Sequence, residues 1–507
     1  MEELRHVAVV DFGSQYTQLI VRRVRELGYF AMLHTVEEFG ELGQPGAIIL
    51  SGGPRSTAEE DAPDIDFDRL QEYGVPVLGI CYGMQLLNIK FGGSVEPSDR
   101  REYGAADLMP TASEGLFKGV SGRSQVWMSH SDTVGDLADN CRVIARNEHG
   151  TPVSLQWGAE CFGIQFHPEV THSHEGLKVL ENFLQTGRGL REFRIEDFKQ
   201  TLIDDIQRRV GDKQVVCGVS GGVDSTVLAV LLKEAGIRMR AIFVDHGLLR
   251  KDEGKEVREN FKRMGVDIET VEASDEFLGA LAGITDPESK REIIGNLFIK
   301  VFWDSVGEAD ILAQGTLYPD VIESASNART KASKIKTHHN RVDKILELQE
   351  QGKVLEPLAE LFKDEVRELG LSLGIQPDIV NRHPFPGPGL AVRCPGEVTA
   401  ERIRIIQECD AIFISSLRTN GWYDRVWQAY AALIPVKTVG VKGDERSYEY
   451  AVSLRAVRSE DAMTADWVEL PHQILRDSSN QILNTVHGVN RVLYDVSTKP
   501  PASIEWE

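Results

Sequence analysis

Three side chains that could carry out covalent acyl transfer stand at two places in the sequence. Cys81 follows the apolar segment 75–80, and His167 and Glu169 lie two residues apart after the apolar segment 162–166. A thiolate can attack a carbonyl carbon, an imidazole can move the proton, and a carboxylate can fix the imidazole tautomer. We therefore predict that Cys81 is a nucleophile, His167 its base and Glu169 the residue that orients the base.

The residues around Cys81 predict a sharp strand-to-helix turn of the kind that carries nucleophiles in α/β enzymes. A buried strand over 75–80 and a helix over 82–91 would meet at this cysteine. Gly79 and Gly83 flank it because such a turn leaves no room for side chains there. The nearby helix N-terminus would favour the thiolate form.

Two backbone N–H groups could stabilise an oxyanion at this turn, those of Tyr82 and of Gly53, which follows a predicted strand over 47–51. The structural alternative is a core cysteine and a surface pair formed by His167 and Glu169. Both motifs would lie at carboxyl ends of strands, where α/β folds keep their sites. This shared location favours the catalytic interpretation.

A second group of small and polar residues lies between a predicted strand over 214–219 and a predicted helix over 226–235. Backbone N–H groups and the positive helix end at such a junction can cradle a phosphate. The lysine of a γ-phosphate-transferring loop is missing, which argues against that class of ATPase. The predicted ATP-binding residues are Ser220, Gly221, Gly222, Val223, Asp224, Ser225, Thr226 and, at the end of the next strand, Asp245.

Asp224 would be an anion beside phosphates, so it requires either a helix-capping role or a bridging Mg²⁺. The structural alternative for the glycines is tight packing of a strand against a helix. Asp245 makes that alternative less favourable, because a carboxylate in this position commonly holds a ribose hydroxyl.

The elements that would position both groups alternate between short β-branched runs and amphipathic helices, which predicts an α/β fold with two parallel-sheet domains. We place the first domain at residues 1–190, a connecting helix at 191–210 and the second domain at 211–396. Residues 397–507 mix helical and alternating patterns, which predicts a smaller α+β domain.

The composition excludes several other classes of protein. The chain has 507 residues with 56 Lys and Arg against 78 Asp and Glu, and the net charge of −22 disfavours nucleic acid and anionic membranes as partners. Its six cysteines form no Cys-x-x-Cys pair, and no apolar run reaches the length of a membrane helix. With no targeting signal at the N-terminus, we expect a cytoplasmic protein with reduced thiols.

The first group of residues resembles the class I glutamine amidotransferases, in the segments 79–85 and 167–169 and in the flanking segments 11–16 and 127–132. Members of that family hydrolyse glutamine with a Cys-His-Glu triad and release ammonia. Position 131 is serine where the family pattern has glycine. By resemblance, the residues that contact glutamine would be Gln85, His130 and Asp132.

The loop at 220–225 resembles the signature of the N-type ATP pyrophosphatases, whose fold is adenine-nucleotide alpha-hydrolase-like and which adenylate a carbonyl oxygen. The order of the two domains and the tail 497–507 are similar to the glutamine-hydrolysing GMP synthetases. This resemblance implies ATP-dependent amination of xanthosine 5′-monophosphate (XMP) to GMP with Mg²⁺, in a homodimer that forms through residues 397–507.

The same resemblance assigns residues to the nucleotide. Contacts with XMP would come from Arg291, Asp444, Lys499 and Glu505, and charge on the adenylating phosphates could be neutralised by Lys336 and Lys363. Two alternatives stay open, which are another glutamine-dependent amidoligase such as NAD synthetase and a non-catalytic nucleotide-binding regulator. The first would normally carry a different glutaminase, and the second would be expected to have lost residues that this chain retains.

Overall fold

The computed structural model describes residues 5–14, 16–57, 59, 61–307, 310–318, 320, 348, 351–442, 445–459 and 464–507. Two predicted site residues, Asp444 and Lys336, lie outside them. The chain divides into two compact units, Met1–Asp197 and Phe198–Glu507. Among the described residues, no helix is both long and apolar enough to cross a membrane.

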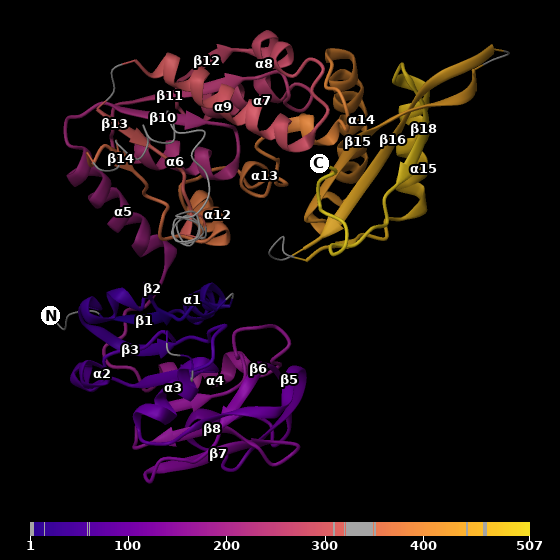
Figure 1. The fold of residues 1–507 in the computed structure, drawn as a ribbon. Helices are drawn as coiled ribbons and strands as arrows, with labels where there is room; N and C mark the ends of the chain where they lie inside the picture. Colours follow the sequence, from indigo (N-terminus) through magenta and orange to yellow (C-terminus); the bar gives the residue numbers. More distant parts are fainter. Residues whose placement is uncertain are drawn as a thin grey trace. The chain divides into compact units, whose positions relative to one another are not determined.

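The first unit is built on a nine-stranded sheet in the order β2-β1-β3-β4-β9-β8-β7-β5-β6 (Figure 1). The pairs from β2 to β9 are parallel, as predicted, and those from β9 to β6 are antiparallel. The strands are β1 His6–Asp11, β2 Ala31–Thr35, β3 Pro45–Leu50, β4 Val77–Ile80, β5 Val95–Pro110, β6 Ser124–Val134, β7 Cys141–Asn147, β8 Pro152–Trp157 and β9 Cys161–Ile164.

The helices of this unit are α1 Thr17–Glu26, α2 Phe67–Tyr73, α3 Tyr82–Lys90 and α4 Gly176–Leu184. Every residue of β3 and β4 is buried, as expected for central parallel strands covered on both faces. Met84 and Leu87 of α3 share one apolar core with Ile48 and Leu50 of β3. This packing fixes the start of α3 against the carboxyl end of the sheet.

The second unit contains a parallel sheet in the order β12-β11-β10-β13-β14, which follows the long helix α5 (Ile195–Val210). Its strands are β10 Val215–Val219, β11 Met239–Asp245, β12 Ile268–Glu272, β13 Ile311–Ala313 and β14 Val354–Leu355. Its helices are α6 Val223–Glu234, α7 Glu253–Arg263, α8 Ser274–Ala280, α9 Pro287–Val306, α12 Lys363–Ser372 and α13 Pro377–Val380.

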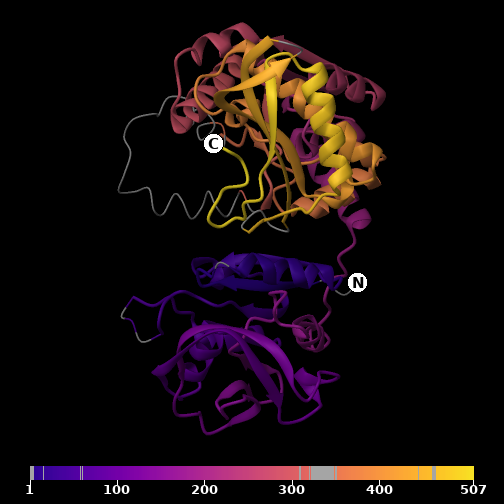
Figure 2. The ribbon, with the colours of Figure 1, turned by 90° about the vertical axis from the view of Figure 1, so that its right-hand side faces the viewer.

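The last part of the chain adds an α+β layer to this unit (Figure 2). Its elements are α14 Ala400–Thr419, β15 Gln428–Lys442, β16 Glu445–Arg458, β17 Asp466–Trp467, α15 His472–Thr485 and β18 Val489–Tyr494. Strand β16 pairs antiparallel with β15 and parallel with β18. Phe277 of α8 and Ile294 of α9 belong to the same buried core as Phe413 of α14 and Leu454 of β16, so the two parts share one core.

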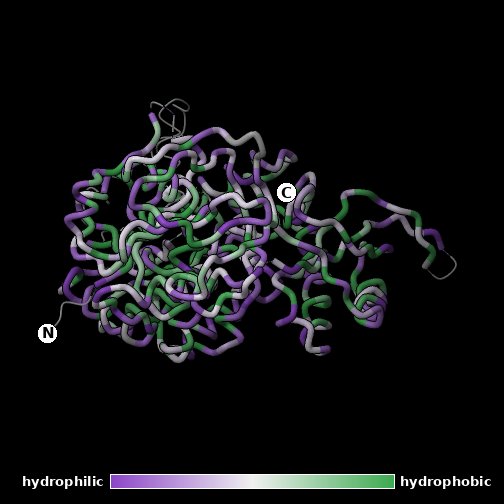
Figure 3. The backbone as a smooth tube through the Cα atoms, turned by 90° about the horizontal axis from the view of Figure 1, so that it is seen from below, coloured by the Kyte–Doolittle hydropathy of each residue, from purple (hydrophilic) through white to green (hydrophobic). Residues whose placement is uncertain are grey.

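The β15–β16 ribbon extends beyond that core and carries hydrophobic residues to its tip (Figure 3). Val439, Val441 and Tyr448 are mostly exposed there, whereas Val452 and Leu454 nearer the centre of the unit are buried. The alternating pattern over 448–456 predicted a strand with one buried face, and this was wrong for 451–457, where every residue of β16 is buried. The apolar character of the ribbon continues past this buried part.

Candidate functional site

Cys81 occupies the turn between β4 and α3 and has a positive φ of 50°, which is uncommon for a residue with a side chain. A Cβ atom added to Gly79 would lie 2.5 Å from the carbonyl carbon of Gly83, and one added to Gly83 would lie 2.5 Å from the Leu50 carbonyl oxygen. Both positions therefore need glycine, as predicted for a sharp turn.

The pairing of β4 with β9 brings the two halves of the predicted triad together. Ile80 and Ile164 are register partners, and the N–H of Cys81 donates to the Ile164 carbonyl over 2.7 Å. Because parallel strands end at one edge, the residues after Ile164 must lie beside Cys81. His167 and Glu169 are both almost fully buried at this edge.

The imidazole of His167 and the carboxylate of Glu169 form a close pair, with Nδ1 and Oε1 2.7 Å apart. Burial lowers the pKa of His167, but the carboxylate of Glu169 and the thiol of Cys81 outweigh it, and this pKa lies well above its ordinary value. The rings of Tyr16 and His167 form a T-shaped contact, with ring centroids 5.0 Å apart. These contacts favour a charged imidazole beside the thiol.

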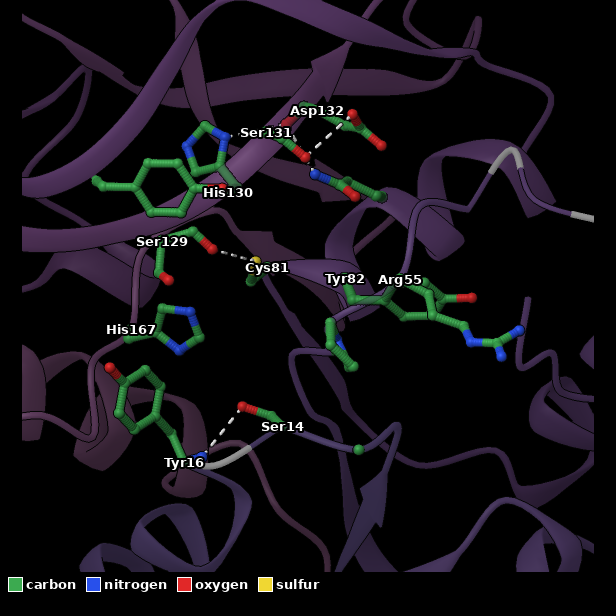
Figure 4. A pocket seen from close by; sticks show the side chains of 15 residues that line it. Ser14, Tyr16, Arg55, Cys81, Tyr82, Ser129, His130, Ser131, Asp132 and His167 are labelled. Atoms are coloured by element: carbon green, nitrogen blue, oxygen red, sulfur yellow. Dashed lines mark hydrogen bonds between the residues drawn. The ribbon is translucent and has the colours of Figure 1, made fainter. Parts of the chain in front are cut away.

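A cavity of about 290 Å³ opens in front of Cys81 (Figure 4). Its lining includes the predicted nucleophile and base, both predicted oxyanion residues and all three predicted glutamine contacts. These residues are Cys81, His167, Gly53, Tyr82, Gln85, His130 and Asp132. A neighbouring glycine is also constrained, because a Cβ on Gly52 would lie 3.0 Å from Cε1 of His167.

The three predicted glutamine contacts are connected by hydrogen bonds to the backbone carbonyl of Asp132. Nε2 of Gln85 donates to the Asp132 carbonyl over 2.9 Å, and Nδ1 of His130 lies 3.0 Å from the same oxygen. Burial lowers the pKa of His130, although a Glu102 carboxylate oxygen lies 3.3 Å from its Nε2. Ser131, where the family has glycine, lines the cavity beside them.

Several residues of this site were not among the predicted site residues, and they include Gln165, Arg55 and Tyr16, although Tyr16 ends the flanking segment 11–16. Nε2 of Gln165 lies 3.5 Å from the sulfur of Cys81, and Arg55 and Tyr16 line the cavity. A polar residue at the end of an apolar strand was the one available signal for Gln165. The others come from loops whose approach depends on the folded sheet.

The remaining five cysteines do not line this cavity. Burial raises the pKa of the five thiols of Cys141, Cys161, Cys217, Cys394 and Cys409. A thiol in such an apolar environment stays protonated and is a poor nucleophile.

In the second unit, the predicted phosphate loop connects β10 to α6. Gly221 has a φ of 75°, and the hydroxyl of Ser225 accepts from the Ser220 N–H over 3.1 Å and donates to the Gly222 carbonyl over 3.2 Å. The hydroxyl of Thr226 also donates to the Gly222 carbonyl, over 2.8 Å. These bonds hold the loop in a tight turn at the N-terminus of α6, where phosphate binding is favoured.

The loop faces a cavity of about 580 Å³. Two residues predicted from distant segments, Arg291 of α9 and Lys363 of α12, line this cavity together with the loop. Its walls also include Phe298 and the proline-rich segment 384–388. Charged and apolar side chains therefore line the same cavity.

Asp224 and Lys363 form an ion pair within this cavity, with Oδ2 and Nζ 2.5 Å apart. The other carboxylate oxygen of Asp224 is buried, and no described residue donates a hydrogen bond to it. A buried carboxylate oxygen that lacks a partner beside a phosphate loop suits Mg²⁺, which is typically held by one or two carboxylates and by substrate phosphates. The residues present therefore fit this ion.

The other predicted nucleotide residues among those described do not line this cavity, and Ser225 and Thr226 of the loop are also absent from its lining. Glu505 accepts from both Nε and Nη2 of Arg393, at 3.0 and 2.9 Å. Lys499 forms an isolated antiparallel β-bridge with Ala465. Neither Lys499 nor Glu505 lines the cavity. Asp245 accepts from the Gly247 N–H over 3.1 Å and is also absent from the lining.

Sequence reasoning missed other lining residues of this second cavity. Arg382 pairs with the buried Glu253, and both line the cavity with Arg367 and His246. Burial lowers the pKa of His246. Such residues carry no local pattern, since most arginines and glutamates in a sequence lie on the surface.

Family models match three parts of this chain. Family models match for Glutamine amidotransferase class-I over residues 8–186, PP-loop domain over 195–284 and GMP synthase C terminal domain over 415–506. Relatives named GMP synthase (glutamine-hydrolyzing) from Thermosipho africanus, Chlorobaculum tepidum and Cytophaga hutchinsonii are each 50% identical to this chain. Each alignment covers 99% of this chain and 99% of the relative. This chain belongs to the family of glutamine-hydrolysing GMP synthases.

Proposed function

We propose that this chain makes GMP by aminating XMP at C2 of the purine, with ATP as the activating substrate and glutamine as the source of ammonia. The products are GMP, AMP, pyrophosphate and glutamate. The observation that carries the proposal is the presence of two cavities in one chain of this family. Cys81 and His167, the latter held by Glu169, line one cavity, and the phosphate loop lines the other.

We assign glutamine hydrolysis to residues 1–190. The thiolate of Cys81 attacks the side-chain amide carbon of glutamine, and the N–H groups of Tyr82 and Gly53 stabilise the oxyanion. His167, held by Glu169, gives its proton to the departing nitrogen so that ammonia leaves and a thioester remains. Water activated by His167 then attacks the thioester and releases glutamate.

We assign activation of XMP to residues 211–396, joined to the first part by a helix within 191–210. The loop 220–225 and the helix end behind it bind phosphates of ATP through backbone N–H groups. The XMP oxygen at C2 attacks the α-phosphorus, and pyrophosphate leaves. Ammonia then attacks C2 and AMP departs, because an adenylated oxygen is a much better leaving group than a carbonyl oxygen.

Charged side chains complete the proposed nucleotide site. Lys363 would neutralise phosphate charge, with Lys336 in support, and Asp224 would hold Mg²⁺, which supplies charge stabilisation at the phosphates. Contacts with XMP are assigned to Arg291, Asp444, Lys499 and Glu505, and the ribose contact of ATP to Asp245. We further propose a cytoplasmic homodimer that forms through residues 397–507, with small molecules rather than nucleic acid or membranes as partners.

The test is a product assay with XMP, ATP, Mg²⁺ and glutamine, in which GMP, AMP and pyrophosphate are separated by chromatography. Equal amounts of GMP and AMP are expected, together with loss of both when Mg²⁺ is chelated. The assay is repeated with deamido-NAD in place of XMP. Amination of that acceptor without GMP would favour the NAD synthetase alternative, and the absence of AMP with any acceptor would favour a regulator.

A single substitution separates the two half-reactions. The Cys81→Ala variant is expected to lose glutamine-dependent synthesis by more than about a thousandfold, as expected when a nucleophile is removed, and to keep ammonium-dependent synthesis. Cys141→Ala, which changes a thiol outside the cavity, is the matched control. Loss of both routes in Cys81→Ala alone would contradict the assignment of separate sites.

A further inference from the structure

Gln165 contacts the sulfur of the proposed nucleophile, Cys81, although it is not a member of the Cys-His-Glu triad. It follows β9 directly, and its side chain is almost completely buried, with the residue 2% exposed. Nε2 of Gln165 donates toward the sulfur of Cys81 over 3.5 Å. A buried amide aimed at a thiol is a costly arrangement unless its polar groups are satisfied.

The orientation of this amide is fixed by its neighbours. The carbonyl of Asp132 can only accept, so Gln85 must present its NH₂ group there, over 2.9 Å. The same NH₂ group also donates to Oε1 of Gln165 over 3.3 Å. The oxygen of Gln165 therefore faces Gln85, and its NH₂ group must face Cys81.

The sulfur has a second polar neighbour with the opposite preference. The carbonyl of Ser129 lies 3.8 Å from it in a geometry that accepts the S–H proton of Cys81 (Figure 4). A carbonyl oxygen favours the protonated thiol, whereas an N–H donor favours the thiolate, because hydrogen bonds to an ionised acceptor are the stronger ones. Gln165 is thus placed to offset the effect of Ser129.

We propose that Gln165 is a positioning residue that stabilises and orients the thiolate of Cys81, with Gln85 holding its amide in the donating orientation. This inference rests on the proposed role of Cys81. It extends the proposed glutaminase by linking the wall of the glutamine cavity, at Asp132, to the attacking sulfur through two buried amides. Gln85 would then act within the protein in addition to any contact with glutamine.

The test replaces Gln165 with methionine, which keeps the length of the side chain and removes the donor. Ionisation of Cys81 is followed as the pH-dependent ultraviolet absorbance of the thiolate, taken as the difference from a background in which Cys81 is alanine. We expect the Gln165→Met titration midpoint to rise by about one pH unit and kcat for glutamine at neutral pH to fall about tenfold. The KM for glutamine and the ammonium-dependent rate should stay within about twofold.

Two further variants keep the inference falsifiable. Gln165→Glu can still accept from Gln85 but places an anion beside the sulfur, so its midpoint should rise further than that of Gln165→Met. Gln156→Met, on the exposed part of β8, is the matched control and should leave the midpoint unchanged. If Gln165→Met does not fold, the titration midpoint of Gln165→Glu alone tests the inference.

A lowered melting temperature with an unchanged thiolate midpoint in both Gln165 variants would overturn the inference, because a purely structural residue would behave in that way. The titration needs no turnover. It therefore distinguishes a failure of this inference from a failure of the proposed function, which the Cys81→Ala product assay tests separately.

Discussion

Replacing Glu169 with glutamine removes one charge from the first site and almost no volume. In the structure Oε1 of Glu169 lies 2.7 Å from Nδ1 of His167, and both residues are buried. Glutamine can still accept a hydrogen bond through its oxygen, so the ring can remain in place. What is lost is the negative charge that keeps the pKa of His167 well above its ordinary value.

The size of the effect follows from the geometry of the pair. With charge delocalised over the ring and the carboxylate, the charge centres are about 4 Å apart, and at an effective dielectric constant of about 20 their interaction is about 4 kcal/mol. At about 1.4 kcal/mol for each factor of ten, this predicts a loss of about a thousandfold in the rate of glutamine hydrolysis. The corresponding Asp→Asn change in a Ser-His-Asp triad costs about ten thousandfold, which is of similar size.

The assay measures glutamate release and GMP formation by Glu169→Gln, with glutamine and with ammonium in parallel. Glutamine hydrolysis should fall about a thousandfold, while ammonium-dependent synthesis should remain. Glu72→Gln, which alters an exposed ion pair with Arg69, serves as the matched control because neither residue lines the first cavity. Retention of more than a tenth of the glutaminase rate would refute the electrostatic role assigned to Glu169, as would an equal loss with ammonium.

Two other predictions concern the phosphate loop and the first sheet. Gly221→Ala should destabilise the second unit by about 2–4 kcal/mol and raise the KM for ATP, because its φ of 75° disfavours a side chain and the new Cβ would overlap Val257. Denaturant unfolding and ATP kinetics measure both effects, and an unchanged unfolding midpoint would contradict the steric role assigned to Gly221. Burial, with a contribution from His34, lowers the pKa of His6 from 6.5 to about 4, so the folded state favours its neutral form. The first unit should therefore lose stability as the pH falls from about 6.5 towards 4, and His6→Gln should flatten this dependence in thermal unfolding. If the unfolding temperature of the His6→Gln variant depends on pH as steeply as that of the unsubstituted protein, the role assigned to His6 is refuted.

The sequence was sufficient to predict the features whose cause is local. The turn at Cys81 and the loop at 220–225 both follow from glycine placement between a strand pattern and a helix pattern. The parallel pairing of β4 with β9 then requires the residues after Ile164 to meet Cys81. The Cys-His-Glu constellation could therefore be predicted because each of its parts lies at the end of a strand.

Features that depend on long-range packing could not be predicted in the same way. The antiparallel half of the first sheet, from β8 to β6, has no distinct local signal in a chain that otherwise alternates strands and helices. The ion pair between Lys363 and Asp224 joins residues 139 positions apart, and only the fold determines that they meet. The hydrogen bonds of Gln165 likewise depend on the packing of α3 against β9.

The predicted XMP contacts illustrate a different limit, because they came from resemblance rather than from residue chemistry. Arg291 lines the second cavity, while Glu505 is held by Arg393 in this state. Lys499 lies outside the lining, and Asp444 is among the residues outside the described ranges. Their roles in XMP binding stay predictions that a binding measurement on single variants can decide.

The contrast between Cys81 and the other five cysteines has a consequence for chemical damage. At neutral pH the five other thiols are almost entirely protonated, and electrophiles and peroxides react with thiolates rather than with thiols. Damage by such agents would therefore concentrate on Cys81, which lines a cavity beside the imidazole of His167. An enzyme damaged in this way would lose glutamine as its nitrogen source while its nucleotide chemistry remained intact.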